Sequence, residues 1–156
     1  IEPQVPAREV VDLHRAGAED SGVDLSLEVD PGMKPVLLDP EAMHRCLSNL
    51  VGNAIQAFEG CCAERLRQVK VMVLNRPEGG VEYRVEDTGT GMDKATRERL
   101  FQSFFSTKGM RGTGIGMMTV KKSVDQHGGL VRIESAPGAG TFVSILLPAK
   151  AGQTMT

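Results

Sequence analysis

A glycine-rich loop that runs into a helix is the feature of this sequence best suited to bind an anion. Residues 112–116 (Gly-Thr-Gly-Ile-Gly) precede an apolar helical pattern, and Lys108 lies four residues before Gly112. Free backbone N–H groups and the helix dipole both favour a phosphate at such a helix start. No Gly-Lys-Ser/Thr follows, so the loop is not a Walker loop. The pattern therefore predicts a phosphate site of another kind.

An aspartate at the end of a strand pattern is the second chemical feature. Val81, Tyr83 and Val85 alternate with charged residues, so the period of two places Asp87 on the apolar side of the predicted strand. A carboxylate on a covered face is costly unless a hydrogen-bond donor meets it. Residues 88–91 (Thr-Gly-Thr-Gly) follow directly. We therefore expect a donor from the protein or from a ligand at Asp87.

Amide side chains on one helix are the third feature. Asp39-Pro40 predicts a capped helix start, and the helix should run from Pro40 to about Phe58. Its apolar stripe comprises Met43, Leu47, Leu50, Val51, Ala54 and Phe58, and its other face carries Arg45, Asn49, Gly52, Asn53 and Gln56. Asparagine and glycine are weak helix formers, and a solvated face usually carries Lys and Glu instead. The pattern indicates a face that something approaches closely.

The elements that must position these groups alternate between helix and strand patterns. We predict helices over 7–20, 40–58, 93–100 and 115–127, strands over 23–29, 69–73, 81–87, 131–134 and 142–147, and a short extended piece at 36–38. This order predicts an α/β two-layer sandwich, in which one mixed, mostly antiparallel sheet is covered on one face by helices.

Length and composition limit the classes of function. The chain has 156 residues, 40% of them hydrophobic, which suits one globular domain. The net charge of −2, without a Lys/Arg run, argues against nucleic acid or a membrane surface as a partner. There is no signal-peptide pattern and no apolar run of about 18 residues. We expect one cytoplasmic domain over 1–149, a polar tail over 150–156, and a longer parent protein, since residue 1 is Ile.

The cysteines and histidines give no site of their own. Cys46, Cys61 and Cys62 are odd in number and match neither a disulfide framework nor a zinc spacing, so we expect reduced thiols. The three histidines, at 14, 44 and 127, are each expected to be structural or solvent-exposed.

Together these motifs resemble the catalytic ATP-binding domain of sensor histidine kinases, in the superfamily shared with gyrase, MutL and heat-shock chaperone ATPases. Five boxes occur in the family's order: 47–57 (LSNLVGNAIQA), 87–92 (DTGTGM), 100–108 (LFQSFFSTK), 112–117 (GTGIGM) and 138–142 (GAGTF). The first and third boxes look most like the nitrogen-regulation type. The resemblance implies a Bergerat-type fold with a mobile lid over about 93–113. Three phenylalanines, at 101, 104 and 105, would anchor that lid, with plain core packing as the alternative.

The resemblance also implies ATP and Mg²⁺ as the bound molecules. Asp87 would accept the adenine amino proton, Thr141 would support the same base, and Met92 would pack on the ring. Asn53 would hold Mg²⁺, and Lys108 would meet the terminal phosphate. The implied nucleotide-binding set is Asn53, Ala57, Asp87, Gly89, Gly91, Met92, Lys108, Gly112, Thr113, Gly114, Ile115, Gly116, Met117 and Thr141. The implied catalytic set is Asn49, Asn53 and Lys108.

Asn49 separates this chain from the hydrolysing members of the superfamily. Those members carry a water-activating Glu four residues before the metal-binding Asn, and an amide cannot take a proton. The γ-phosphoryl should therefore pass to a nucleophile on another domain. No histidine here has the flanking residues of the kinase phosphorylation box. The expected partners are histidine-bearing dimerisation helices of the same kinase and a downstream response regulator receiver domain, with the isolated domain monomeric.

Three alternatives remain open from the sequence. A related serine kinase of the anti-sigma-factor type would share the boxes, and so would a non-catalytic nucleotide-sensing module. A dinucleotide-binding oxidoreductase is a more distant alternative, because Glu134 lies about where a ribose-binding acid would.

Overall fold

The computed structural model describes residues 1–56, 58, 67–89, 113–135 and 140–148 of the chain. In sequence order the elements are α1 (Gln4–Asp20), β1 (Asp24–Val29), α2 (Pro40–Gln56), β2 (Gln68–Asn75), β3 (Val81–Asp87), α4 (Thr113–Gln126), β4 (Leu130–Ser135) and β5 (Thr141–Leu147). The predicted helices at 7–20, 40–58 and 115–127 and the five predicted strands are present, with ends shifted by a few residues. The predicted helix over 93–100 lies outside the described residues.

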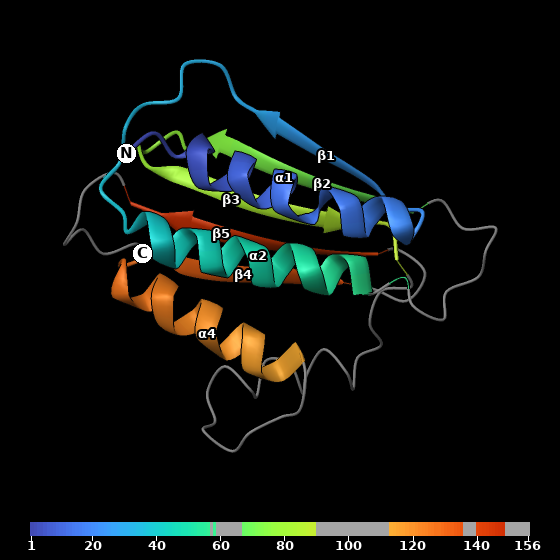
Figure 1. Cartoon of the computed structure of the whole chain (residues 1–156). Helices are drawn as coiled ribbons and strands as arrows, with labels where there is room; N and C mark the ends of the chain where they lie inside the picture. Colours follow the sequence, from blue (N-terminus) through green and yellow to red (C-terminus); the bar gives the residue numbers. More distant parts are fainter. Residues whose placement is uncertain (57, 59–66, 90–112, 136–139, 149–156) are drawn as a thin grey trace.

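The strands form one sheet in the order β1-β2-β3-β5-β4. β1 and β2 are parallel, whereas β2–β3, β3–β5 and β4–β5 are antiparallel. Figure 1 shows α1, α2 and α4 side by side over one face of this sheet. The predicted two-layer sandwich is therefore confirmed. A dinucleotide-binding domain would need a parallel sheet covered on both faces, so that alternative is wrong.

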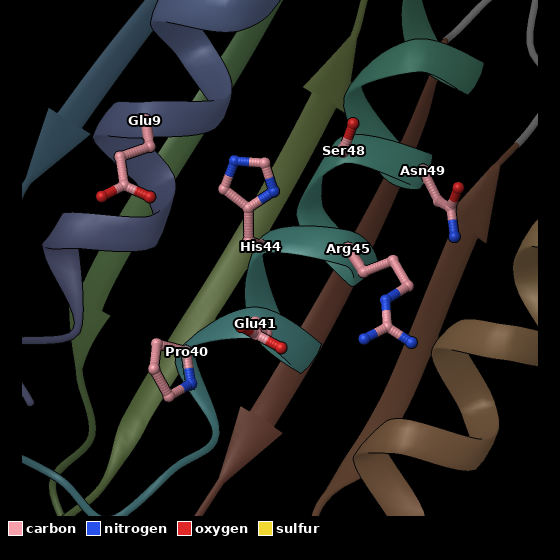
Figure 2. Close-up of a pocket in the computed structure, with 7 residues that line it drawn as sticks. All are labelled: Glu9, Pro40, Glu41, His44, Arg45, Ser48 and Asn49. Carbon is pink, nitrogen blue, oxygen red and sulfur yellow. The ribbon is translucent and has the colours of Figure 1, made fainter.

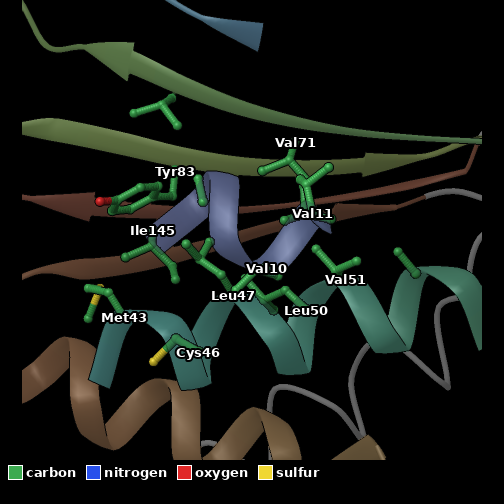
Figure 3. Packing of buried hydrophobic residues seen from close by; sticks show 14 of the residues in the cluster. Val10, Val11, Met43, Cys46, Leu47, Leu50, Val51, Val71, Tyr83 and Ile145 are labelled. Atoms are coloured by element: carbon green, nitrogen blue, oxygen red, sulfur yellow. The ribbon is translucent and has the colours of Figure 1, made fainter. Parts of the chain in front are cut away.

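The core lies between the helix layer and the sheet, and α2 is its central helix. All six residues of the predicted apolar stripe are buried. They belong to one cluster with Val10 and Val11 of α1 and with Tyr83 and Ile145 of the sheet. Figure 3 labels four of the six, Met43, Leu47, Leu50 and Val51, within this packing. The Tyr83 hydroxyl also donates a hydrogen bond to the carbonyl of Pro3, just before α1. Because both neighbouring helices pack against α2, its orientation is fixed from either side.

The start of α2 is held by two separate contacts. Asp39 Oδ1 accepts hydrogen bonds from the backbone N–H groups of Glu41 at 3.0 Å and Ala42 at 3.2 Å, as expected of a capping carboxylate. His127, just beyond α4, lies against the same residue. Its Nδ1 faces the carbonyl of Ser123 at 2.7 Å and must donate, so its Nε2 accepts from the N–H of Asp39 at 2.9 Å. One imidazole thus ties the end of α4 to the start of α2.

The structure refines two sequence predictions. The extended piece at 36–38 does not join the sheet; instead Val36 exchanges two backbone hydrogen bonds with Ile1, each 2.9 Å long. α2 ends at Gln56 rather than at Phe58, whose ring is buried in a turn beyond the helix. Within the part of the chain that the structure describes, no helix has the length and apolar character to cross a bilayer.

Candidate functional site

Four elements end or begin at one end of the sandwich, on the right in Figure 1: the end of α2, the end of β3, the start of α4 and the start of β5. Predicted site residues lie at each of these four ends. Asp87 closes β3, Thr141 opens β5, and Asn53 is in the last turn of α2. Asp87 and Thr141 are direct cross-strand partners, so their side chains share one face of the sheet. The fold therefore brings together residues that lie far apart in the sequence.

Asp87 stands at the turn that follows β3, where its side chain is half-buried. Its Oδ1 accepts a hydrogen bond from the backbone N–H of Gly89 at 2.9 Å. This N–H is one of the hydrogen-bond donors that the sequence pattern leads us to expect at Asp87. A carboxylate offers about four acceptor positions, which is more than this one N–H requires.

Gly140 explains how the start of β5 comes so close to Asp87. Its φ of +77° lies in the left-handed region, and a Cβ at this position would overlap the backbone carbonyl oxygen of Asp87. Only glycine fits such an approach without moving the neighbouring strand. The glycine thus permits the contact between β3 and β5 at the level of Thr141.

Thr141 has a hydroxyl partner that sequence reasoning missed. Its Oγ1 lies 2.8 Å from Oγ of Ser135, the last residue of β4. Ser135 Oγ also donates to the carbonyl of Gly140 at 3.1 Å. Ser135 belongs to none of the five boxes, and only the register of β4 on β5, in which it faces Thr141, reveals it.

Asn53 carries a buried polar atom that meets no partner. Its Nδ2 is shielded from solvent and makes no hydrogen bond within the described structure. A buried donor of this kind costs free energy unless an acceptor reaches it. A phosphate oxygen would satisfy the nitrogen, and the oxygen of the same amide could ligate a divalent cation. Among the described residues, no group of three His, Cys, Asp or Glu side chains could hold a metal ion.

Asn49, one helical turn before Asn53, lines an open cleft of about 380 Å³ on the outer surface of α2. The cleft is lined by Glu9, Pro40, Glu41, His44, Arg45, Ser48 and Asn49. Figure 2 shows Arg45 and Asn49 on the side of α2 that faces α4, and Glu9 opposite on α1. The cleft is open to solvent, so Asn49 can be reached by a group that arrives from outside the domain.

His14 and Gly52 pack between α1 and α2. His14 Nε2 lies 2.8 Å from Ser48 Oγ, and a Cβ on Gly52 would meet His14 Cε1 at an ordinary 3.7 Å. Burial, and then the neighbouring His44, lowers the pKa of His14. At Gly52 the group that approaches the helix is therefore the side chain of His14. His14 is a structural group, as expected.

The glycine-rich loop does lead into a helix. α4 begins at Thr113, two residues earlier than predicted, so its first N–H groups belong to the predicted phosphate loop, Thr113–Met117. The side chains of residues 113–117, and the predicted site residues Ala57, Gly91, Met92, Lys108 and Gly112, lie outside the described structure.

Comparison with known proteins gives a family match over most of the chain. Residues 38–151 match the family model described as histidine kinase-, DNA gyrase B- and HSP90-like ATPase. The virulence sensor protein BvgS of Bordetella bronchiseptica is 39% identical over 139 residues, which cover 82% of this chain and 11% of BvgS. The sensor histidine kinase ZraS of Klebsiella oxytoca is 33% identical over 136 residues, which cover 87% of this chain and 28% of ZraS. The chain thus spans less than a third of the length of either relative.

Solved structures show the same fold. The catalytic domain of the histidine kinase ThkA superposes with a TM-score of 0.78 at 26% identity, covering 97% of this chain and 95% of that domain. Full-length ShkA in complex with AMPPNP gives a TM-score of 0.79 at 25% identity, covering 95% of this chain and 30% of ShkA. The match to ThkA is therefore between two domains of nearly equal extent.

Proposed function

Because the chain belongs to the family of histidine kinase-, DNA gyrase B- and HSP90-like ATPases, and is the ATP-binding domain of a sensor histidine kinase, we propose that it binds Mg-ATP and phosphorylates a histidine on a separate dimerisation domain. The observation that carries this proposal is that the Asp87–Thr141 pair and the end of α2, which holds the unsatisfied amide of Asn53, lie at the same end of the sandwich. We take this kinase domain to span residues 1–149, with 150–156 as a tail.

The base of the nucleotide is placed at the paired ends of β3 and β5. Asp87 is an acceptor at this point and suits the donor hydrogens of the adenine amino group. Thr141, directly opposite, supports the same base. Gly89, whose N–H holds the Asp87 carboxylate, and Gly91 with Met92 beyond it complete the base side of the proposed site.

The phosphates are placed between the end of α2 and the start of α4. Asn53 would donate from its nitrogen to a phosphate oxygen and hold Mg²⁺ through its oxygen, which makes it the proposed metal ligand. When bound, Mg²⁺ would neutralise negative charge on the phosphates. The rest of this side comprises Ala57, Lys108, Gly112 and the N–H groups of Thr113, Gly114, Ile115, Gly116 and Met117. We propose that residues 93–113 form a lid that brings Lys108 to the terminal phosphate.

Transfer rather than hydrolysis follows from the chemistry of Asn49. Its amide cannot accept the proton of an attacking water, so activation of water is weak at this position. A neutral imidazole nitrogen needs no such activation: it attacks the γ-phosphorus, the bond from that phosphorus to the β-γ bridging oxygen breaks, and ADP leaves. Asn49, open to the cleft on α2, orients the incoming ring. A receiver domain of a response regulator would then accept the phosphoryl group.

Thermal unfolding with added nucleotide tests the binding step. A ligand at 100 times its dissociation constant adds about 2.7 kcal/mol of stability, so Mg-ADP and Mg-ATP should raise Tm clearly. Asp87→Ala should remove that rise. Asn53→Ala should reduce the rise with Mg²⁺ present more than the rise in its absence. If neither nucleotide shifts the Tm of the unaltered protein, the proposed function is refuted.

Phosphotransfer is tested by adding the histidine-bearing helices of the parent kinase with labelled ATP. The product should be labile in acid, as phosphohistidine is, and Asn53→Ala should abolish it. An acid-stable product would support the serine-kinase alternative. Nucleotide binding without any labelled product would support the nucleotide-sensing alternative.

A further inference from the structure

Ser135 holds the hydroxyl of Thr141 in a defined direction. Its Oγ contacts two oxygens, the carbonyl of Gly140 at 3.1 Å and Thr141 Oγ1 at 2.8 Å. A serine hydroxyl carries one proton, and a carbonyl oxygen can only accept. Both contacts are therefore satisfied together only when Ser135 donates to Gly140 and Thr141 donates to Ser135.

The consequence for Thr141 is that its proton is already used. What its oxygen presents to a ligand is lone pairs, that is, an acceptor. Asp87 lies directly across from Thr141 on the same face and is also an acceptor. Ser135, Thr141 and Asp87 stand at one level across β4, β5 and β3, since Ser135 and Asp87 are both register partners of Thr141.

We propose that Ser135 is a positioning residue that keeps Thr141 an acceptor, and so helps the site to choose a purine with an exocyclic amine over one with a carbonyl. This inference rests on the proposed placement of the base at Asp87. An amine at the purine 6-position offers donor hydrogens to the acceptors. A carbonyl there brings a third acceptor against them. Without Ser135, the Thr141 hydroxyl can rotate and donate to that carbonyl, which relaxes the choice.

Binding of ADP and IDP to the same protein, measured by calorimetry, tests the inference because IDP carries a carbonyl in place of the amine. The Ser135→Ala variant should lower the preference for ADP over IDP by about fivefold, roughly the effect of one ordinary hydrogen bond. Ser135→Thr keeps the hydroxyl and should retain most of the preference. In a Thr141→Val protein, Ser135→Ala should change the preference by less than about twofold, because two residues that act through one contact are not additive.

Several outcomes would overturn the inference. Equal weakening of ADP and IDP by Ser135→Ala would show a structural role alone. The same effect of Ser135→Ala in the Thr141→Val protein as in the unaltered one would show that Ser135 does not act through Thr141. The unliganded Tm of each variant reports its folding, and the ratio of the two affinities does not change when only the folded fraction changes. If the unaltered protein binds neither nucleotide, the proposed function itself fails, which is a separate result.

Discussion

Removing the side chain of Asn53 should stabilise the unliganded domain while it weakens the binding of Mg-nucleotide. The buried Nδ2 has no partner within the described structure, and an unsatisfied buried donor costs about 1–3 kcal/mol. Alanine is also favoured over asparagine in a helix interior by up to about 0.7 kcal/mol. Truncation of the half-buried asparagine also loses some van der Waals packing, which offsets part of this gain. The net effect of Asn53→Ala should be a free energy of unfolding that is higher by at least about 1 kcal/mol. For a domain of this size that corresponds to about 2–4 °C in Tm.

Asn49→Ala is the matched control for this prediction. It lies on the same helix, one turn earlier, and is also half-buried, yet its amide is not a buried atom without a partner. Asn49→Ala should gain only the stability that comes from the higher helix propensity of alanine. Urea unfolding of both variants without nucleotide measures the two free energies. If Asn53→Ala gains no more than Asn49→Ala, the buried nitrogen has a partner in solution and the reasoning is refuted.

Three further predictions concern the framework of the site. Gly140→Ala should lower the free energy of unfolding by at least about 2 kcal/mol, because alanine is strained in the left-handed backbone conformation and its Cβ would overlap the Asp87 carbonyl oxygen. Urea unfolding measures this loss, and an unchanged midpoint would contradict the close approach of β5 to Asp87. The lowered pKa of His14 means that this imidazole binds a proton more readily in the unfolded chain than in the folded one, so the free energy of unfolding should fall as pH drops below about 6.5. His14→Gln should flatten the dependence of Tm on pH in that range. An unaltered slope would show that His14 is not the source of the pH dependence. His127→Ala should cost about 1 kcal/mol, or about 2–4 °C in Tm, because it separates the end of α4 from Asp39; no shift in a thermal melt would show that the two bonds contribute nothing.

The sequence was sufficient to predict the layers, the strand that ends at Asp87 and the start of α2, for identifiable reasons. Alternation at Val81, Tyr83 and Val85 both predicts β3 and sets the side on which Asp87 lies. The Asp39-Pro40 pair predicts the start of α2 through backbone chemistry that is local to a few residues. Features of this kind depend on near neighbours in the chain, so a single sequence carries them.

What the sequence could not predict depends on contacts between distant segments. Nothing near Ser135 signals that it meets Thr141, because the contact exists only in the register of β4 on β5. The pattern at 36–38 is extended, but its partner is Ile1 rather than the sheet, and local propensity does not choose between the two. The pattern around Gly52 indicates a close approach, but helical periodicity does not reveal that the approaching group is His14 of α1.

The pairing of Asp87 with Thr141 also determines which partly folded states of the chain a nucleotide can bind. The two residues become neighbours only when β5, the last strand in the sequence, lies between β3 and β4. A partly folded chain that holds α1, α2 and the β2–β3 hairpin lacks this half of the base site. Nucleotide should therefore slow amide hydrogen exchange most where opening requires β5 to leave the sheet, and least in the β2–β3 turn at the far end of the molecule.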